Sequence, residues 1–142
     1  MFCNPGKDTI DKIKNLHLTL TERPQPELLI ALANVSPDVD YEIKISTKEF
    51  TSVCPLSLSQ PDYATITIKY RPNADCVELK SLKLFFVSFR NVAIFHEMVP
   101  AYILKELVKL LSPNWMKVTG TFTTRGGLDT TVEAEYFEEA RE

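Results

Sequence analysis

A cysteine and an aspartate lie close together in the stretch SVCPLSLSQPDYATI, as Cys54 and Asp62. A cysteine thiolate is a strong nucleophile, but a free thiol has a pKa of about 8.5 and is mostly protonated at neutral pH. A carboxylate held within hydrogen-bond reach can accept or relay the thiol proton. The pair therefore predicts a nucleophile with an acid–base partner, and the plain alternative is a half-buried cysteine in a turn.

Three further segments carry polar residues that can serve a site. Residues 77–83 begin one expected helix, residues 95–97 (Phe-His-Glu) begin a second, and residues 125–127 (Arg-Gly-Gly) lie in an expected turn. The elements around them must bring these segments to Cys54 for any shared chemistry.

The 142 residues suit a single domain spanning 1–142, with a weakly specified segment at 1–26. The net charge of −3 gives no general attraction to nucleic acid or to anionic membranes. No apolar stretch is long enough to span a bilayer. Cys3, Cys54 and Cys76 show no CxxC or CxxH spacing, so neither a metal site nor a disulfide framework is expected. We expect a cytoplasmic protein, and we assign Cys3 and Cys76 no function.

Hydrophobic periodicity predicts the order of the elements. Asp8 can cap a short helix, residues 27–35 are of ambiguous type, and residues 40–47 and 63–70 alternate as strands. Residues 52–62 read as the loop between these strands because they contain two prolines and three serines. Helices are expected at 77–91 and 95–111, the second with Pro100 in its first turn or at a kink. Strands at 115–123 and 130–136 should form a hairpin. The inner face of the first long helix is predicted to hold Leu79, Leu82, Phe85, Phe86 and Phe89, with Lys80, Ser81 and Lys83 on its polar side.

This order, strand-strand-helix-helix-strand-strand, predicts an α+β domain with an antiparallel sheet and both helices on one face. Its uncovered edges favour edge-to-edge association into a homo-oligomeric ring, possibly two stacked rings, with sites at the subunit seams.

In order and spacing the polar segments resemble the QueF-type nitrile reductases, which convert 7-cyano-7-deazaguanine to 7-aminomethyl-7-deazaguanine in queuosine (tRNA modification) biosynthesis. The resemblance covers about residues 40–137, and no single motif is as specific as the combination. It implies the ring-forming tunnelling fold. The residues that carry it are FTSVCP at 50–55, QPDYATI at 60–66, ELKSLKLFFVSFRN at 78–91, FHE at 95–97 and TTRGG at 123–127.

The resemblance implies a covalent mechanism. Cys54 would add to the nitrile carbon to give a thioimide, and Asp62 would relay the proton to the nitrile nitrogen. The family loop usually reads CPxTGQPD, whereas CPLSLSQPD lacks the glycine and is one residue longer. We expect Leu58 to point away from the thiol, with Cys54, Asp62 and Glu97 still lining one cavity.

The resemblance also implies the binding residues for the 7-deazapurine and for NADPH. Glu97 would accept two adjacent N–H groups of the guanine-like edge, His96 would donate to the ring carbonyl, and Phe95 would stack on the ring. Backbone N–H groups near Val77, Glu78 and Leu79 would face the same ring. The cofactor residues implied are Lys80, Ser81, Lys83, Arg125 and Gly126.

Three other functions fit parts of the pattern. An amidotransferase would attack the same nitrile within tRNA, but the intact ELKSLKL motif and the acidic chain oppose direct contact with nucleic acid. A non-catalytic purine- or pterin-binding ring protein would accommodate the altered loop. A thiol peroxidase would leave the Phe-His-Glu segment and the basic helix unexplained.

Overall fold

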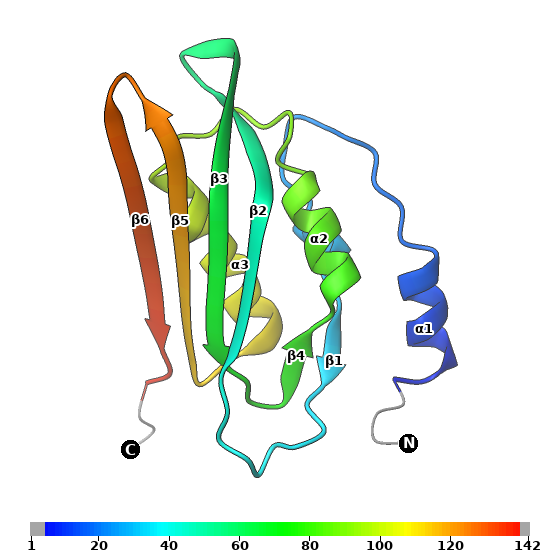
Figure 1. The fold of residues 1–142 in the computed structure, drawn as a ribbon. Helices are drawn as coiled ribbons and strands as arrows, with labels where there is room; N and C mark the ends of the chain where they lie inside the picture. Colours follow the sequence, from blue (N-terminus) through cyan, green and yellow to red (C-terminus); the bar gives the residue numbers. More distant parts are fainter. Residues whose placement is uncertain (1–4, 140–142) are drawn as a thin grey trace.

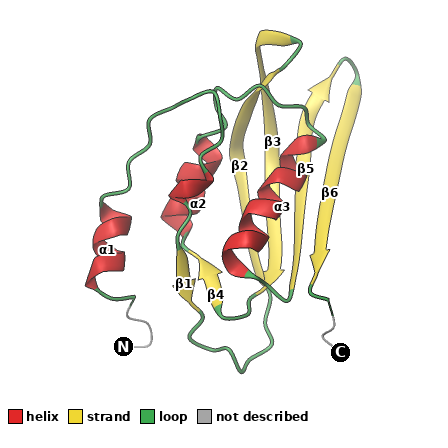
Figure 2. Cartoon of the chain, turned by 180° about the vertical axis from the view of Figure 1, so that it is seen from behind, coloured by secondary structure: helices red, strands yellow, loops and turns green. Residues whose placement is uncertain are grey.

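A computed structural model describes residues 5–139, in which four antiparallel strands form one sheet in the order β2-β3-β5-β6 (Figure 1). Helices α2 (Leu79–Val87) and α3 (Met98–Leu111) both cover one face of this sheet (Figure 2). The predicted α+β architecture and its element order are confirmed. The strands are β2 (Ile43–Cys54), β3 (Ser57–Arg71), β5 (Trp115–Arg125) and β6 (Leu128–Phe137).

The remaining elements lie beside α2. The apolar run at 27–35 resolves into a 3-10 turn, Pro26–Leu28, and a short strand β1 (Ala31–Ala33), which pairs with β4 (Asp75–Val77). Helix α1 (Lys7–Lys14) begins at Gly6 and not with a capping aspartate, so the prediction that Asp8 caps it is wrong.

The core lies between the sheet and the two helices. Alternate residues of β3 and β5 face the helices, as their patterns predicted, and β6 covers the edge of the same layer. One predicted core residue is wrong, because the Leu79 side chain is 61% exposed at the start of α2. The buried residues in this layer include Ile66, Ile68, Tyr70, Leu82, Phe85, Phe89, Ile103, Leu107, Met116 and Val118.

A β-bulge decides which side of β2 faces the core. Lys48 and Glu49 together oppose one residue of β3, so the register shifts between Thr47 and Phe50. Before the bulge the odd-numbered residues face inward, and after it the even-numbered Phe50 and Ser52 are buried. Without this bulge, the end of β2 would present the opposite set of side chains to the core.

Residues 52–62 form the end of a hairpin, and the prediction that this whole segment is a loop is wrong. Strand β2 continues to Cys54 and β3 begins at Ser57, so the chain turns at Pro55-Leu56. The additional residues lie within β3, where the register shifts between the Cys54–Ser57 and Val53–Pro61 pairs. Leu58 is 71% exposed, as the sequence predicted for the longer loop.

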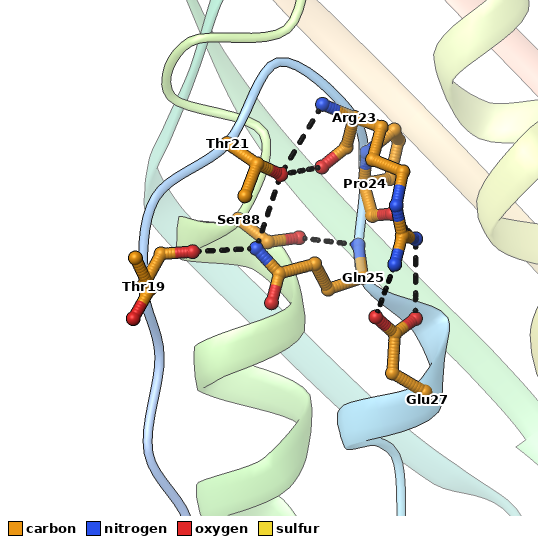
Figure 3. A network of polar contacts seen from close by, with 7 residues as sticks. All are labelled: Thr19, Thr21, Arg23, Pro24, Gln25, Glu27 and Ser88. Atoms are coloured by element: carbon orange, nitrogen blue, oxygen red, sulfur yellow. Dashed lines mark hydrogen bonds and ion pairs between the residues drawn. The ribbon is translucent and has the colours of Figure 1, made fainter.

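The segment before β1 is fastened to the far end of α2 (Figure 3). The backbone N–H of Gln25 donates to the buried Ser88 Oγ at 3.0 Å, and Gln25 Nε2 donates to the Thr19 carbonyl at 2.7 Å. Arg23 and Glu27 form an exposed ion pair at 2.6 Å next to it. Together these contacts hold residues 19–27 against the end of α2 that is nearest the candidate site.

Candidate active site

One pocket of about 120 Å³ gathers most of the predicted catalytic and substrate residues. It lies at the end of the sheet where β2 ends, β3 begins and β5 ends. The prediction that Cys54, Asp62 and Glu97 line one cavity is confirmed, and the cavity is formed within one chain. Its lining residues are Cys54, Pro55, Asp62, Phe95, His96, Glu97 and Arg125.

A short parallel bridge brings residues 95–97 to the cysteine. The Val53 N–H donates to the Val92 carbonyl at 2.9 Å, and the Ile94 N–H donates to the Val53 carbonyl at 3.1 Å. The residues that follow Val53 and Ile94 in the chain are Cys54 and Phe95. The backbone itself therefore places the start of α3 next to the thiol.

The Asp62 carboxylate is held by two partners within the chain. The Asp62 side chain is 6% exposed, and its Oδ1 accepts a hydrogen bond from Arg125 Nη1 at 2.7 Å. Its Oδ2 lies 3.3 Å from His96 Nε2. Charge-assisted contacts of this kind fix the orientation of a carboxylate as well as its position. The ion pair with Arg125 is a contact that the sequence did not indicate.

The His96 ring is itself positioned by an aromatic stack. Its centroid lies 4.0 Å from that of Phe122, with the ring planes 10° apart. Phe122 is buried, and a Cβ on Gly120 would lie 2.9 Å from its ring. The only sequence signal for Phe122 was the alternation of residues 115–123.

Phe95 and Glu97 remain accessible to a ligand. Both are exposed, and Glu97 is the residue before α3 but makes no capping hydrogen bond with its side chain. Helix α3 starts at Met98 with Pro100 in its first turn, which confirms one of the two predicted positions for this proline. A carboxylate that does not cap its helix is available to accept hydrogen bonds from a ligand.

The start of α2 does not share this pocket. It lies beside β4, whereas β2, which ends at Cys54, ends toward the opposite end of the helix (Figure 1). The expectation of free N–H groups here is wrong at two positions: the Val77 N–H donates to the Tyr70 hydroxyl at 3.1 Å, and the Glu78 N–H donates to the Ile30 carbonyl at 2.8 Å. Burial raises the pKa of Tyr70 to about 12, so this hydroxyl stays neutral.

Two of the residues assigned to the substrate and the cofactor have structural partners. The Glu78 carboxylate caps α2 by accepting from the N–H groups of Lys80 and Ser81, each at 2.7 Å. The prediction that Ser81 lies on the polar side of the helix is wrong, because its buried hydroxyl accepts from the Ile30 N–H at 3.0 Å.

The two lysines of α2 are exposed, as predicted. Lys80 Nζ donates to the Ile13 carbonyl of α1 at 2.9 Å. Lys83 and Leu79 line a separate groove of about 300 Å³ between α2 and β2. Gly126 and its neighbour Gly127 form the two-residue β5–β6 turn, with φ angles of 56° and 76° that favour glycine.

Of the other cysteines, Cys76 does not line the pocket. It is half-buried, with its sulfur 3.8 Å from the Tyr41 hydroxyl, and Cys3 lies outside the described residues. Between residues 5 and 139, no cluster of three His, Cys, Asp or Glu side chains is placed to hold a metal ion. Over the same residues, no helix has the length and apolar character needed to cross a membrane.

A four-stranded antiparallel sheet with two helices on one face, and a pocket where a thiol meets an ion-paired carboxylate, define a tunnelling-fold domain with an open polar site. Residues 61–141 match the family described as QueF-like protein. With this match and the relatives below, the chain belongs to the QueF-like family.

Two relatives and one solved structure illustrate the similarity. The chain is 50% identical over 112 residues to the NADPH-dependent 7-cyano-7-deazaguanine reductase of Chloroherpeton thalassium, covering 79% of this chain and 96% of the relative. It is 52% identical over 105 residues to the protein of the same name from Thermomicrobium roseum, covering 74% of this chain and 81% of that relative. The crystal structure of the archaeosine synthase QueF-Like in the apo form has the same fold, with a TM-score of 0.63, 24% identity, and coverage of 70% and 96%.

Proposed function

We propose that this chain is an NADPH-dependent 7-cyano-7-deazaguanine reductase that acts in queuosine biosynthesis in the cytoplasm. The observation that carries the proposal is the single pocket in which Cys54, Asp62 and Glu97 meet. The names of relatives 50% and 52% identical to the chain support the same reaction.

The first step requires only groups in this pocket. The Cys54 sulfur adds to the electrophilic nitrile carbon, so that a C–S bond forms and one π bond of the C≡N group is lost to give a C=N bond. The thiol proton passes through Asp62 to the nitrile nitrogen, which leaves a neutral covalent thioimide. Because His96 and Arg125 hold both carboxylate oxygens, Asp62 can exchange this proton without reorienting.

Recognition of the deazapurine falls to the residues before α3. The exposed Glu97 carboxylate can accept the two adjacent N–H groups of the guanine-like edge. Phe95, which is 44% exposed, offers a ring for stacking. His96 has one nitrogen directed to Asp62, so only its other ring nitrogen is available to the substrate.

The basic residues fit a phosphate-bearing cofactor. Lys83 is exposed beside the α2–β2 groove, and Lys80 and Arg125 present further N–H donors of the kind that bind phosphate. Gly126 leaves the backbone beside Arg125 open, since a Cβ there would meet nothing within 4 Å. When bound, NADPH would supply two hydrides, one to the thioimide carbon and one to the imine that remains after the C–S bond breaks and Cys54 leaves as the thiol.

We also propose a homo-oligomeric ring with sites at the subunit seams. Within one chain, no residue of α2 lines the Cys54 pocket, and β2 ends toward the opposite end of α2 from the start of that helix (Figure 1). A neighbouring subunit can supply Leu79, Lys80 and Lys83 to a pocket that already contains the thiol and Glu97. The outer edge of β6, and that of β2 before the bridge at Val53, are suitable surfaces for that association.

The test has two stages. Incubation with 7-cyano-7-deazaguanine alone, followed by intact-mass analysis, should show one covalent adduct per chain, and added NADPH should then be consumed with formation of the amine. Absence of an adduct would favour the non-catalytic binding protein or the peroxidase. An adduct without NADPH consumption would favour the amidotransferase.

A further inference from the structure

We propose that Arg125 positions the Asp62 carboxylate for the proton transfer that accompanies addition of Cys54 to the nitrile. This inference rests on the proposed function. It gives Arg125 a role in the first chemical step, before any cofactor phosphate is bound.

A β-bulge directs Arg125 toward the pocket. Thr123 and Thr124 oppose one residue of β6, so the register shifts between Phe122 and Arg125. In a regular strand Arg125 would face away from the side on which Phe122 is buried; the bulge returns it to the Phe122 side. The odd-numbered Arg125 and the inward-facing Asp62 can meet only because of this shift.

The bulge is held beside Asp62 by its own hydrogen bonds. Thr123 Oγ1 donates to the Tyr63 carbonyl at 3.4 Å, which ties the bulged segment to the residue next to Asp62. Thr124 Oγ1 donates to an Asp129 carboxylate oxygen across the hairpin. These contacts fix the strand end from which Arg125 reaches the carboxylate.

The resulting ion pair is a specific one. An almost fully buried carboxylate is costly unless it is paired, and Arg125 approaches it at 2.7 Å while remaining 33% exposed itself. His96 holds the other carboxylate oxygen from the opposite side. Loss of Arg125 would leave Asp62 with one partner and free to rotate away from Cys54.

A role in positioning can be separated from a role in cofactor binding by omitting NADPH. Arg125→Gln should slow formation of the 7-cyano-7-deazaguanine adduct by roughly 10- to 100-fold, since a small misplacement of a reacting group costs about 10²-fold. The dissociation constant of the nitrile before reaction should change by less than about threefold, because Glu97 anchors the ring and is unchanged. Both quantities come from adduct mass against time over a range of nitrile concentrations.

Two variants complete the test. Arg125→Lys keeps the charge but loses the planar fork, and it should react at a rate between those of wild type and Arg125→Gln. Arg71→Gln removes an exposed arginine at the other end of β3 and should react like wild type.

Adduct formation by Arg125→Gln at the wild-type rate would overturn the inference and leave Arg125 as a cofactor residue only. A loss confined to nitrile affinity would also overturn it. Failure of the wild-type protein to form any adduct would instead contradict the proposed function, and this inference with it.

Discussion

Asp62 is the residue at which the structure adds most to the sequence. Its two carboxylate oxygens have different partners, His96 from the start of α3 and Arg125 from the end of β5. His96 is fixed in turn by its stack on Phe122. The Asp62 carboxylate is therefore oriented by two segments that are distant in the chain, and substitutions in either segment should change its orientation.

At Cys54, we predict that substitution by alanine abolishes both the adduct and NADPH turnover. Binding of the deazapurine should remain measurable by calorimetry, because Glu97 and Phe95 are unchanged. Reduction at a rate near that of the wild-type protein would exclude the covalent mechanism.

For Asp62, asparagine keeps the shape of the side chain but cannot exchange the proton. Asp62→Asn should slow adduct formation by roughly 10²- to 10⁴-fold, the contribution of a positioned acid or base. Its effect on nitrile affinity should be much smaller. A variant that binds poorly but reacts normally would show that Asp62 is a binding residue.

At the scale of elements, packing between β5 and α3 determines where the His96 ring lies. Gly120 on β5 leaves room for the Phe122 ring and for Pro100 of α3, whose Cγ would lie 3.0 Å from an added Cβ. The φ angle of Gly120 is not in the left-handed region. The lack of room for a side chain, and not the backbone conformation, therefore explains why a glycine occupies this position. The strand and helix can pack this closely only with a residue that lacks a side chain here.

Gly120→Ala should therefore affect both stability and chemistry. Overpacking of this kind typically costs about 1–3 kcal/mol of unfolding free energy. Displacement of Phe122 should also slow adduct formation through His96. Urea unfolding and adduct kinetics measure the two effects, with Thr121→Ala on the exposed face of the same strand as control. If Gly120→Ala is destabilised but forms the adduct at the wild-type rate, the position of Phe122 does not affect the reaction.

At the scale of the whole molecule, one chain holds the thiol and Glu97 in the same pocket, while Lys83 of α2 lines a different groove. In the proposed ring, a complete site would then be formed by two chains that meet at a seam. This division can be tested by mixing subunits with different defects.

Mixed oligomers of Cys54→Ala and Glu97→Ala chains should stay inactive, because neither chain carries an intact pocket. Mixed oligomers of Cys54→Ala and Lys83→Gln chains should regain activity, because the pocket of one can meet the helix of the other. NADPH consumption after co-refolding measures both. Restored activity in the first mixture would place Cys54 and Glu97 on different sides of the seam.

The sequence by itself determined the element order, the inward faces of β3 and β5, and the resemblance through which Cys54, Asp62 and Glu97 were recognised. These features are local, since alternation and short motifs depend on neighbours in the chain. The same local reasoning predicted that the longer segment after Cys54 would leave Leu58 exposed.

Only the tertiary structure decided which side chains reach the pocket. The bulges in β2 and β5 reverse the alternation that the sequence suggests, and they exist because each strand must pair with its neighbour in one register. Ser81 is buried because residue 30 and the start of α2 meet across the fold. Arg125 meets Asp62 for the same reason: the contact joins residues 63 positions apart, and pairing at that distance is set by the packed sheet and not by local sequence.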